Sequence, residues 1–379
     1  MIYFDAAATT LEKPRQVREA VAAAVGSMSS PGRGSYAAAR RAEETAFLCR
    51  SEAAKLFGIT DPARVIFTGS ATHGLNIAIR SLVKPGGRVV ISGLEHNAVT
   101  RPLYVIPGLR TEIAAAPVFD PDAAVEGLTA ALQEKADAVI WTHVSNVFGA
   151  VQPMERIADL CRRMGTPLIV DASQSAGVLD LDVVKLQAAY VAMPGHKGLY
   201  GPQGTGLLLC GREDVIPLLQ GGTGSASRLQ EMPGQLPDRL EPGTHNMPGI
   251  AGLLAGLRFV HRMGPQRIRA HERVLLEEAV REMREIRGVR LYASDDPAAQ
   301  TGVLSFTVTG WDCEELGQVL AQKGIAVRAG LHCAPLAHRT AGTLETGTVR
   351  LSFSAFNTRE QVRRFADVLR RELREKVTL

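Results

Sequence analysis

Short apolar runs alternate with helical patterns through most of this 379-residue chain, and this alternation limits the fold more than any other feature. Continuous apolar strands separated by helices are typical of a mostly parallel sheet whose two faces are both covered. We therefore expect an α/β fold. The expected strands are Val65–Phe67, Arg88–Ser92, Ala138–His143, Leu168–Val170, Ala188–Met193 and Gly206–Leu209. The expected helices are Pro14–Val25, Ala37–Phe57, Gly74–Leu82, Ala123–Glu134, Met154–Met164 and Ile250–His261.

The last third of the sequence has a different order of elements and predicts a separate α+β domain. A long loop rich in Gly, Pro, Ser and Thr precedes it at Gly221–His245, and long loops in compact enzymes are usually functional. Thr358 is the expected N-cap of the last helix. The elements expected after the loop are a charged helix at Arg267–Arg287, strands at Val303–Val308, Ile325–Arg328 and Thr348–Phe353, and a helix from Thr358 to about Glu375.

Composition and charge exclude several classes of protein. Hydrophobic residues make up 45% and charged residues 22%, as in ordinary globular proteins. A net charge of +4 without a long Lys/Arg block predicts no nucleic-acid partner, and no apolar run reaches the ~20 residues that span a bilayer. The start at Met1 has no basic leader, and the five scattered cysteines form no C-x-x-C pair. We expect a cytoplasmic protein with reduced thiols, no membrane partner and no metal site.

Lys197 has the most unusual setting of the lysines. It follows an apolar strand within the Gly- and Pro-rich segment Met193–Pro202, in a chain whose cations are mostly Arg. A solvated loop lysine would also fit this segment. However, a lysine held among apolar or cationic neighbours has a lowered pKa and becomes a nucleophilic amine, as Schiff-base lysines are.

Asp171 ends the apolar run Leu168–Val170, 26 residues before Lys197. Ligands of open α/β sheets bind beyond the carboxyl ends of the strands. Pyridoxal phosphate (PLP) needs a lysine for its aldehyde and a carboxylate that keeps its ring nitrogen protonated. The two residues together therefore predict a PLP site, with a turn or N-cap role as the alternative for Asp171.

The segment Thr68–Gly74 lies between an expected strand and an expected helix. Backbone N–H groups and hydroxyls at a helix N-terminus bind phosphate. No G-K-[ST] follows, so the segment is not a P-loop. Ala71 and Thr72 are candidate phosphate ligands, and ordinary N-capping by Ser70 or Thr72 is the alternative.

Motifs spread over nearly the whole chain resemble those of class V aminotransferase-fold enzymes, most closely cysteine desulfurases with a short sulfur-carrying loop. The matching segments are Tyr3–Thr10 (D-x-A-A-T-T), Glu95–Ala98 (E-H-x-A/S), His143–Gly149 (H-x-S-N-x-x-G), His196–Lys197 (H-K), Glu241–Asn246 (E-x-G-T-x-N) and Arg328–Ala334 (R-x-G-x-H-C-A). The resemblance implies a PLP-dependent transferase of fold type I and a homodimer. It also implies a large PLP-binding domain over residues 15–255, and a smaller domain of residues 1–14 and 256–379.

The resemblance assigns roles around the cofactor. Asp171 and Gln174 would pair with the pyridine nitrogen and the phenolic oxygen, and His96 would stack on the ring and share proton transfer with Lys197. Asn146 would contact cofactor and substrate. The remaining cofactor residues would be His196, next to the lysine, and Thr244, which would reach the phosphate of the neighbouring subunit. A structural, hydrogen-bonded histidine is the alternative for His96.

Cys333 is the candidate nucleophile. It lies in a Gly-containing turn after a strand, beside His332 and near Arg328, and cations favour the reactive thiolate. The resemblance makes it the catalytic cysteine. A buried, inert thiol is the alternative for Cys333, and it is the state we expect for the other cysteines. These are Cys49, Cys161, Cys210 and Cys313.

Arg350 lies on the apolar strand Thr348–Phe353, where an arginine is costly unless it is paired. The resemblance makes it the guanidinium that binds the substrate α-carboxylate, with Arg328 and Asn146 as further substrate ligands. A structural ion pair with an acidic residue of the small domain is the alternative for Arg350.

Two positions differ from the family pattern. Relatives commonly carry a phosphate-binding serine two residues before the H-K histidine, where this chain has Pro194-Gly195, and His73 stands where an acidic residue is frequent. The candidates to replace the missing hydroxyl are Gly222, Thr223 and Ser225.

The expected function is conversion of L-cysteine to L-alanine, with a persulfide on Cys333 that passes to a sulfur-acceptor protein. The alternatives on the same fold are a selenocysteine lyase, an aminotransferase and an epimerase. A catalytically silent sulfur-relay or scaffold protein is the alternative from another class. A nicotinamide enzyme is not expected, because no G-x-G-x-x-G follows an early strand.

Overall fold

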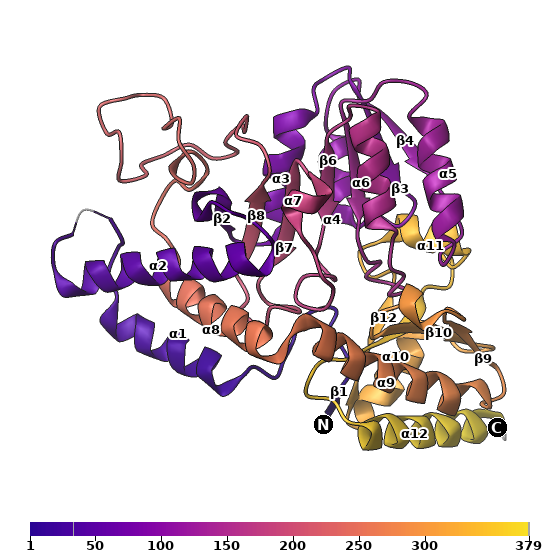
Figure 1. Cartoon of the computed structure of the whole chain (residues 1–379). Helices are drawn as coiled ribbons and strands as arrows, with labels where there is room; N and C mark the ends of the chain where they lie inside the picture. The colour runs from indigo at the N-terminus through magenta and orange to yellow at the C-terminus, as the bar shows by residue number, and fades with distance from the viewer. Residues whose placement is uncertain (33, 378–379) are drawn as a thin grey trace.

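The computed structural model describes residues 1–32 and 34–377, and its centre is a seven-stranded sheet (Figure 1). The strands lie in the order β2-β8-β7-β6-β5-β3-β4, of which β7, β6, β5, β3 and β4 are parallel and β8 is antiparallel to both neighbours. The predicted α/β class and mostly parallel sheet are confirmed. The bounds are β2 (Val65–Thr68), β3 (Arg88–Ser92), β4 (Arg110–Ala114), β5 (Ala138–Thr142), β6 (Leu168–Asp171), β7 (Tyr190–Pro194) and β8 (Gly206–Cys210).

Helices cover both faces of this sheet, which is why its inner strands are apolar throughout. In β3, Val90 packs into the core on one face and its neighbours Val89 and Ile91 pack into the core on the other, because successive side chains of a strand alternate. The helices of this part of the chain are α1 (Arg15–Ser27), α2 (Ala37–Leu56), α3 (Ala71–Leu82), α4 (Asn97–Tyr104), α5 (Pro121–Ala131), α6 (Met154–Arg163), α7 (Val183–Leu186) and α8 (Met247–Met263).

The loop predicted over Gly221–His245 is irregular apart from the 3-10 turn η2 (Asp238–Leu240). It leads into α8, which packs against α1 and α2 (Figure 1). The predicted domain boundary between residues 255 and 256 lies within α8, and the division into domains stays a prediction.

A second, four-stranded antiparallel sheet follows, in the order β12-β13-β10-β9. The Thr358 Oγ1 accepts the N–H of Gln361 at 3.3 Å, which confirms the predicted N-cap. The strands are β9 (Val289–Tyr292), β10 (Val303–Val308), β12 (Arg328–Gly330) and β13 (Thr348–Ser352). The helices of this part are α9 (Pro265–Arg284), α10 (Cys313–Gln322), α11 (Pro335–Ala341) and α12 (Arg359–Val377). Two further 3-10 turns are η1 (Pro62–Arg64), which precedes β2, and η3 (Pro297–Ala299), which precedes β10.

The prediction of one strand over Ile325–Arg328 is wrong. The segment divides into β11 (Ile325–Ala326), which pairs in parallel with β1 (Ile2–Tyr3), and β12, which joins the four-stranded sheet. Strands β4 and β9 were not predicted. Both lie at sheet edges and are partly exposed, so their sequences contain no continuous apolar run.

A buried carboxylate joins α9 to α12. The Glu278 side chain is 1% exposed and accepts hydrogen bonds from Arg359 and Arg363, each at 2.6 Å, while Arg281 lies at 2.7 Å. Burial raises the pKa of Glu278, but the arginines outweigh it and hold the pKa at about 2.

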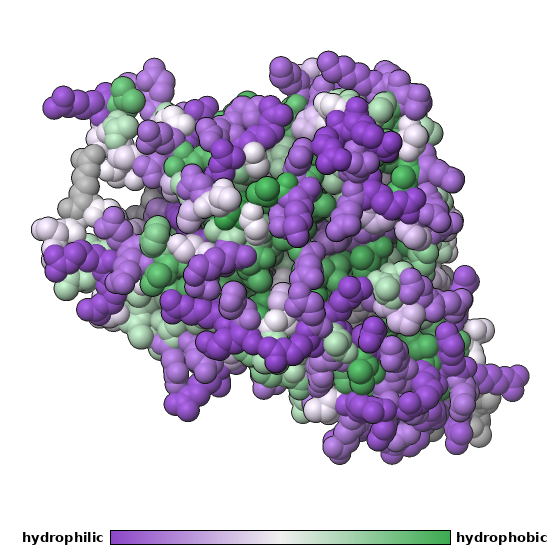
Figure 2. Space-filling model, viewed as in Figure 1, coloured by the Kyte–Doolittle hydropathy of each residue, from purple (hydrophilic) through white to green (hydrophobic). Residues whose placement is uncertain are grey.

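The outer surface over these helices is mostly hydrophilic (Figure 2). No helix within residues 1–32 and 34–377 is long and apolar enough to cross a membrane.

The N-terminal segment is anchored in the core of the second sheet. The Phe4 side chain is fully buried, with ring centroids 5.2 Å from Phe353 and 6.0 Å from Phe365 in edge-to-face contacts. The chain end therefore packs against elements that lie more than 300 residues away in sequence.

We predict that Phe4→Ala lowers the free energy of unfolding by about 3–5 kcal/mol, because it leaves a cavity among buried rings. Urea denaturation measures this. The matched control is Phe47→Ala on α2, whose side chain is 60% exposed and whose loss should change stability by less than about 0.5 kcal/mol. Equal effects of the two substitutions would contradict the anchoring role of Phe4.

Candidate active site

A pocket lies at the carboxyl ends of β5, β6 and β7, beside the N-terminus of α3. It collects most of the predicted cofactor residues in one place. Those that line it are Ala71, Thr72, His96, Asn146, Asp171, Gln174, His196 and Lys197. The carboxyl ends of neighbouring parallel strands meet at one sheet edge, which is why residues far apart in sequence converge here.

Lys197 lies inside this pocket, so the alternative of a solvated loop lysine is wrong. Burial lowers the pKa of its ammonium to about 8. Asp171 opposes this shift and Arg350 adds to it. A lysine with this pKa has an appreciable fraction of free amine near neutral pH, which is the nucleophilic form.

Asp171 is 3% exposed and ends the central strand β6, which pairs with β5 and β7. Its Oδ1 accepts the N–H of Ser173 at 2.9 Å, so the predicted turn role is also present. It is the only acidic residue that lines the pocket in the described chain. A carboxylate in the same pocket as Lys197 can pair with a cationic heterocycle that binds there.

His96 caps α4 and faces the pocket. Its Nδ1 accepts the N–H of Ala98 at 3.0 Å, so the neutral ring carries its proton on Nε2. Burial lowers the pKa of His96, which favours this neutral form. The structural, hydrogen-bonded role that we named as an alternative is therefore present, as a helix cap, together with a place in the pocket that Lys197 lines.

Behind His96 lies Glu95, which is fully buried. Its Oε1 accepts hydrogen bonds from Ser92 Oγ at 2.5 Å and from the N–H of Thr142 at 2.7 Å, whereas its Oε2 has no partner in the described parts of the chain. Burial, with a smaller contribution from Asp171, raises the pKa of Glu95 to about 8.

Helix α3 begins at Ala71, and the Ser70 Oγ accepts the N–H of His73 at 3.2 Å. This is the N-cap that we named as an alternative. The first-turn N–H groups of a helix have no intrahelical acceptor and remain available to an anion. Burial lowers the pKa of His73, and its Nδ1 accepts the N–H of Gly69 at 3.4 Å.

The structure gives a physical reason for glycine at position 195. A Cβ there would lie 2.2 Å from the Thr205 Oγ1, so no side chain can be accommodated at this position without a shift. The position two residues before His196, where relatives commonly carry serine, is Pro194. The proposed replacements are not in this pocket. Gly222, Thr223 and Ser225 do not line it, and the Thr223 and Ser225 hydroxyls lie 3.1 Å from each other.

Cys333 is exposed, whereas the other cysteines are buried as predicted. Both His332 and Cys333 have positive φ, of 52° and 54°, a strained conformation that is concentrated at functional loops. Two hydrogen bonds of 2.8 Å hold the loop: Asn146 Nδ2 donates to the His332 carbonyl and the Asn97 N–H donates to the Cys333 carbonyl. The thiol is thereby fixed next to the pocket, and it also acts electrostatically on Lys197.

His332 does not supply the positive charge that the sequence suggested for Cys333. Burial lowers the pKa of His332 to about 2, and its ring stacks on His338 with the Nδ1 3.2 Å from the His338 Nε2. The ring is therefore neutral at physiological pH and supports the loop by packing.

Arg350 is 2% exposed and forms the ion pair that we named as an alternative. Its Nη2 lies 3.0 Å from the Asp5 carboxylate, and its Nη1 donates to the Asn146 carbonyl at 2.8 Å. Arg328 binds the other oxygen of Asp5 at 2.7 Å. No role was predicted for Asp5, although the D-x-A-A-T-T motif that contains it was an available signal.

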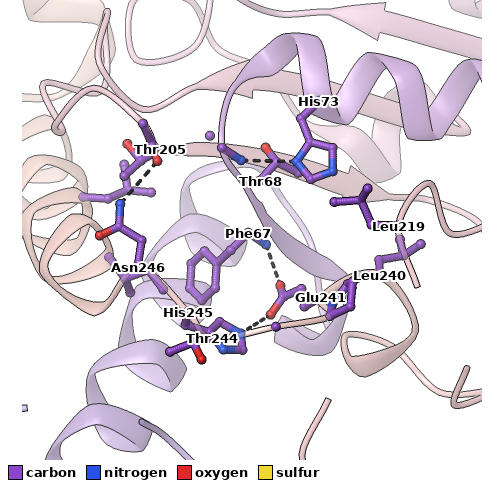
Figure 3. Close-up of a pocket in the computed structure, with 17 residues that line it drawn as sticks. Phe67, Thr68, His73, Thr205, Leu219, Leu240, Glu241, Thr244, His245 and Asn246 are labelled. Carbon is purple, nitrogen blue, oxygen red and sulfur yellow. Dashed lines mark hydrogen bonds and ion pairs between the residues drawn. The ribbon is translucent and has the colours of Figure 1, made fainter. Parts of the chain in front are cut away.

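Thr244 does not join the Lys197 pocket within this chain. It is exposed and lines a neighbouring pocket with Phe67 and Glu241 (Figure 3). The Glu241 carboxylate there accepts the Phe67 N–H at 2.6 Å, contacts His245 at 2.6 Å and pairs with Arg50 at 2.6 Å. The position of Thr244 toward a neighbouring subunit stays a prediction.

The residues of the Lys197 pocket fit PLP. They offer an amine, a buried carboxylate, a neutral imidazole and a helix N-terminus for a phosphate. The unpartnered Nε of Arg350, which is buried with no acceptor in residues 1–32 and 34–377, leaves one donor for a substrate carboxylate.

Comparison with known proteins identifies the family. The aminotransferase class-V family profile matches residues 2–365, and the chain belongs to this family. A probable cysteine desulfurase of Mycolicibacterium paratuberculosis is 34% identical, with 98% of this chain and 55% of that protein covered. A probable cysteine desulfurase of Methanothermobacter thermautotrophicus is 31% identical, with 97% and 94% covered. The chain thus spans little more than half of the first relative and nearly all of the second.

The solved structures agree with these relatives. The apo structure of a cysteine desulfurase from Thermococcus onnurineus has a TM-score of 0.90 at 29% identity, over 99% of this chain and 95% of that one. The predicted PLP-dependent transferase fold type I and the resemblance to cysteine desulfurases are therefore confirmed.

We predict that Glu95→Gln makes the stability of the protein less dependent on pH. The Glu95 pKa is about 8 when folded and 4.5 as the unperturbed value, so its contribution to stability is complete below pH 4.5 and is lost as the pH rises through 8. The free energy of unfolding should fall less between pH 5 and 9 in the variant than in the unchanged protein.

Chemical denaturation across this pH range measures the effect. The exposed Glu126→Gln on α5 is the control and should follow the unchanged protein. If the free energy of unfolding of Glu95→Gln changed with pH as much as that of the unchanged protein, Glu95 would not be protonated in the folded state.

Proposed function

We propose that the protein is a PLP-dependent cysteine desulfurase that converts L-cysteine to L-alanine and retains the sulfur on Cys333. The observation that carries the proposal is that Lys197 and Asp171 line one pocket, with the loop of an exposed cysteine held by Asn146 of the same pocket. The relatives named cysteine desulfurase support it.

Bound PLP would supply an electron sink for the negative charge that develops when the substrate Cα–H bond breaks. Lys197 would hold the cofactor covalently, and Asp171 would keep its ring nitrogen protonated. Gln174 would donate to the phenolic oxygen, and the N-terminus of α3 with Ala71 and Thr72 would bind the phosphate. His196 would fix the lysine segment, since its Nδ1 lies 3.0 Å from the Thr9 Oγ1.

Proton transfer falls to Lys197 and His96. Once the substrate amine has displaced it from the cofactor, the free amine of Lys197 would take the α-proton, and the neutral His96 would offer its Nε2–H at the face of the ring. The Cys333 thiolate would then attack the substrate sulfur, so that an S–S bond forms, the Cβ–S bond breaks and the carbon receives a proton. A covalent sulfur carrier divides one transfer into two easier steps.

Substrate binding would rest on Arg350, Arg328 and Asn146. Asp5 pairs with both arginines in the structure, one through each carboxylate oxygen, which keeps the Arg350 guanidinium charged and oriented at low exposure. A substrate carboxylate would engage the face of Arg350 that carries its unpartnered Nε.

The remaining assignments follow the family. A homodimer would bring Thr244 of the partner subunit to the phosphate, and a sulfur-acceptor protein would take the persulfide from the exposed Cys333 loop. A cytoplasmic location would keep the thiol reduced.

We predict that Cys333→Ser binds PLP with an unchanged visible absorption band but loses alanine and sulfide formation by at least about 100-fold, because the hydroxyl is a poor sulfur acceptor. A coupled assay for alanine and sulfide measures the loss. Cys161→Ala, at a buried thiol of α6, should retain activity. Full desulfuration by Cys333→Ser would exclude Cys333 as the nucleophile.

We predict that Asp171→Asn slows cysteine turnover by about 10²–10⁴-fold, since a neutral amide does not stabilise a protonated ring nitrogen. Steady-state kinetics at saturating PLP separate this loss from weaker cofactor binding. Asp182→Asn, which keeps a helix-capping side chain on α7, is the control and should leave turnover unchanged. Equal rates for the two variants would remove Asp171 from the mechanism.

A further inference from the structure

A second, smaller cavity shares part of its wall with the cofactor pocket. Lys197 and Gln174 line both spaces. About 30 Å³ of the second cavity is open to the centres of water molecules, enough for roughly two waters at the 10–15 Å³ that each needs. Its wall is polar, since it includes the hydroxyl residues Thr10, Thr301, Ser352 and Ser354.

Glu272 of α9 faces this cavity and has no evident structural role. Glu272 is 6% exposed, and its carboxyl forms no hydrogen bond or ion pair with the part of the chain that the structure describes. The other buried acids of this region differ, because Glu278 is bound by arginines and Glu95 by Ser92 and Thr142. A buried carboxyl without partners is costly, so its presence at a water-sized cavity calls for a function.

We propose that Glu272 exchanges protons with the Lys197 amine through water held in this cavity, and so acts as a proton-relay residue behind the cofactor pocket. In one direction the Glu272 O–H gives its proton to a water, which gives a proton to the Lys197 Nζ, and the reverse returns it. No electrons move, and a carboxylate and an ammonium result. The proposal deepens the proposed function, because the lysine must gain and lose a proton in each turnover.

Proton affinities support the exchange. Burial alone raises the pKa of Glu272 to about 8, and burial lowers that of Lys197 to the same value. Proton transfer is most efficient between groups whose pKa values match each other and the working pH.

The other charged groups near Glu272 have partners of their own and do not interrupt the proton exchange between Glu272 and Lys197. Tyr200 is the one further titratable residue on the described cavity wall, and its hydroxyl accepts the Ala355 N–H at 2.8 Å. On neighbouring elements, Arg350 of β13 binds Asp5, and His271 of α9 meets the Asn357 carbonyl at 3.0 Å. Arg359 and Arg363 of α12 bind Glu278, and Arg370 of the same helix binds Glu282.

The test is the titration of Lys197 in the full chain without cofactor, measured by competitive labelling of its amine and mass spectrometry. An ionised Glu272 favours the ammonium of Lys197, so Glu272→Gln should lower the Lys197 midpoint by about one pH unit, a tenfold change in proton affinity. The labelling does not depend on desulfurase activity, so its failure is distinguishable from failure of the proposed function.

The matched control is Glu278→Gln on the same helix. It removes a buried carboxylate with arginine partners and should leave the Lys197 midpoint unchanged. Should Glu272→Gln not fold, Glu272→Asp withdraws the acid from the cavity by one methylene and should lower the midpoint by a smaller amount. A folded Glu272→Gln or Glu272→Asp variant with the midpoint of the unchanged protein would overturn the proposal.

Discussion

The burial of one amine determines the rest of this site. Removing the Lys197 ammonium from water disfavours its charge and lowers its pKa, and the nearby Asp171, Asp5 and Cys333 oppose that shift. The result is an amine that is reactive near neutral pH and that does not destabilise the fold as an unpaired buried charge would. Three parts of the fold contribute the charges that act on Lys197. The first sheet supplies Asp171, the second sheet supplies Arg350, and the N-terminal segment supplies Asp5.

The N-terminal segment connects the two sheets at the site. Phe4 anchors it in the core of the second sheet, and the next residue, Asp5, binds Arg350 and Arg328. The Arg350 guanidinium in turn holds Asn146, whose amide holds the Cys333 loop. A chain of packed and hydrogen-bonded groups thus runs from the first strand to the exposed thiol, which is why the thiol and the lysine pocket keep a fixed relation.

Local patterns were sufficient to predict the central features of the fold and the site. The buried strands, the lysine after β7 and the aspartate at the end of β6 follow from apolar runs and from the rule that ligands bind at strand ends. The pairing of Asp5 with Arg350 could not be predicted in the same way, since it joins residues 345 positions apart and depends on how the sheets dock. The family motifs showed which residues matter but not that these two share a bond.

Other features depended on packing that no local pattern encodes. Glu272 looks like an ordinary acid of a charged helix, and only the fold turns it toward a cavity beside Lys197. Gly195 has no room for a side chain because the Thr205 Oγ1 would lie 2.2 Å from its Cβ. The edge strands β4 and β9 lack continuous apolar runs, so their pairing is decided by their neighbours.

The most direct test of the account is to incubate the protein with PLP, reduce it with borohydride and map the modified peptide by mass spectrometry. The account predicts one phosphopyridoxyl group, on the peptide that contains Lys197. Modification of a different lysine, or none at Lys197 at saturating PLP, would contradict it.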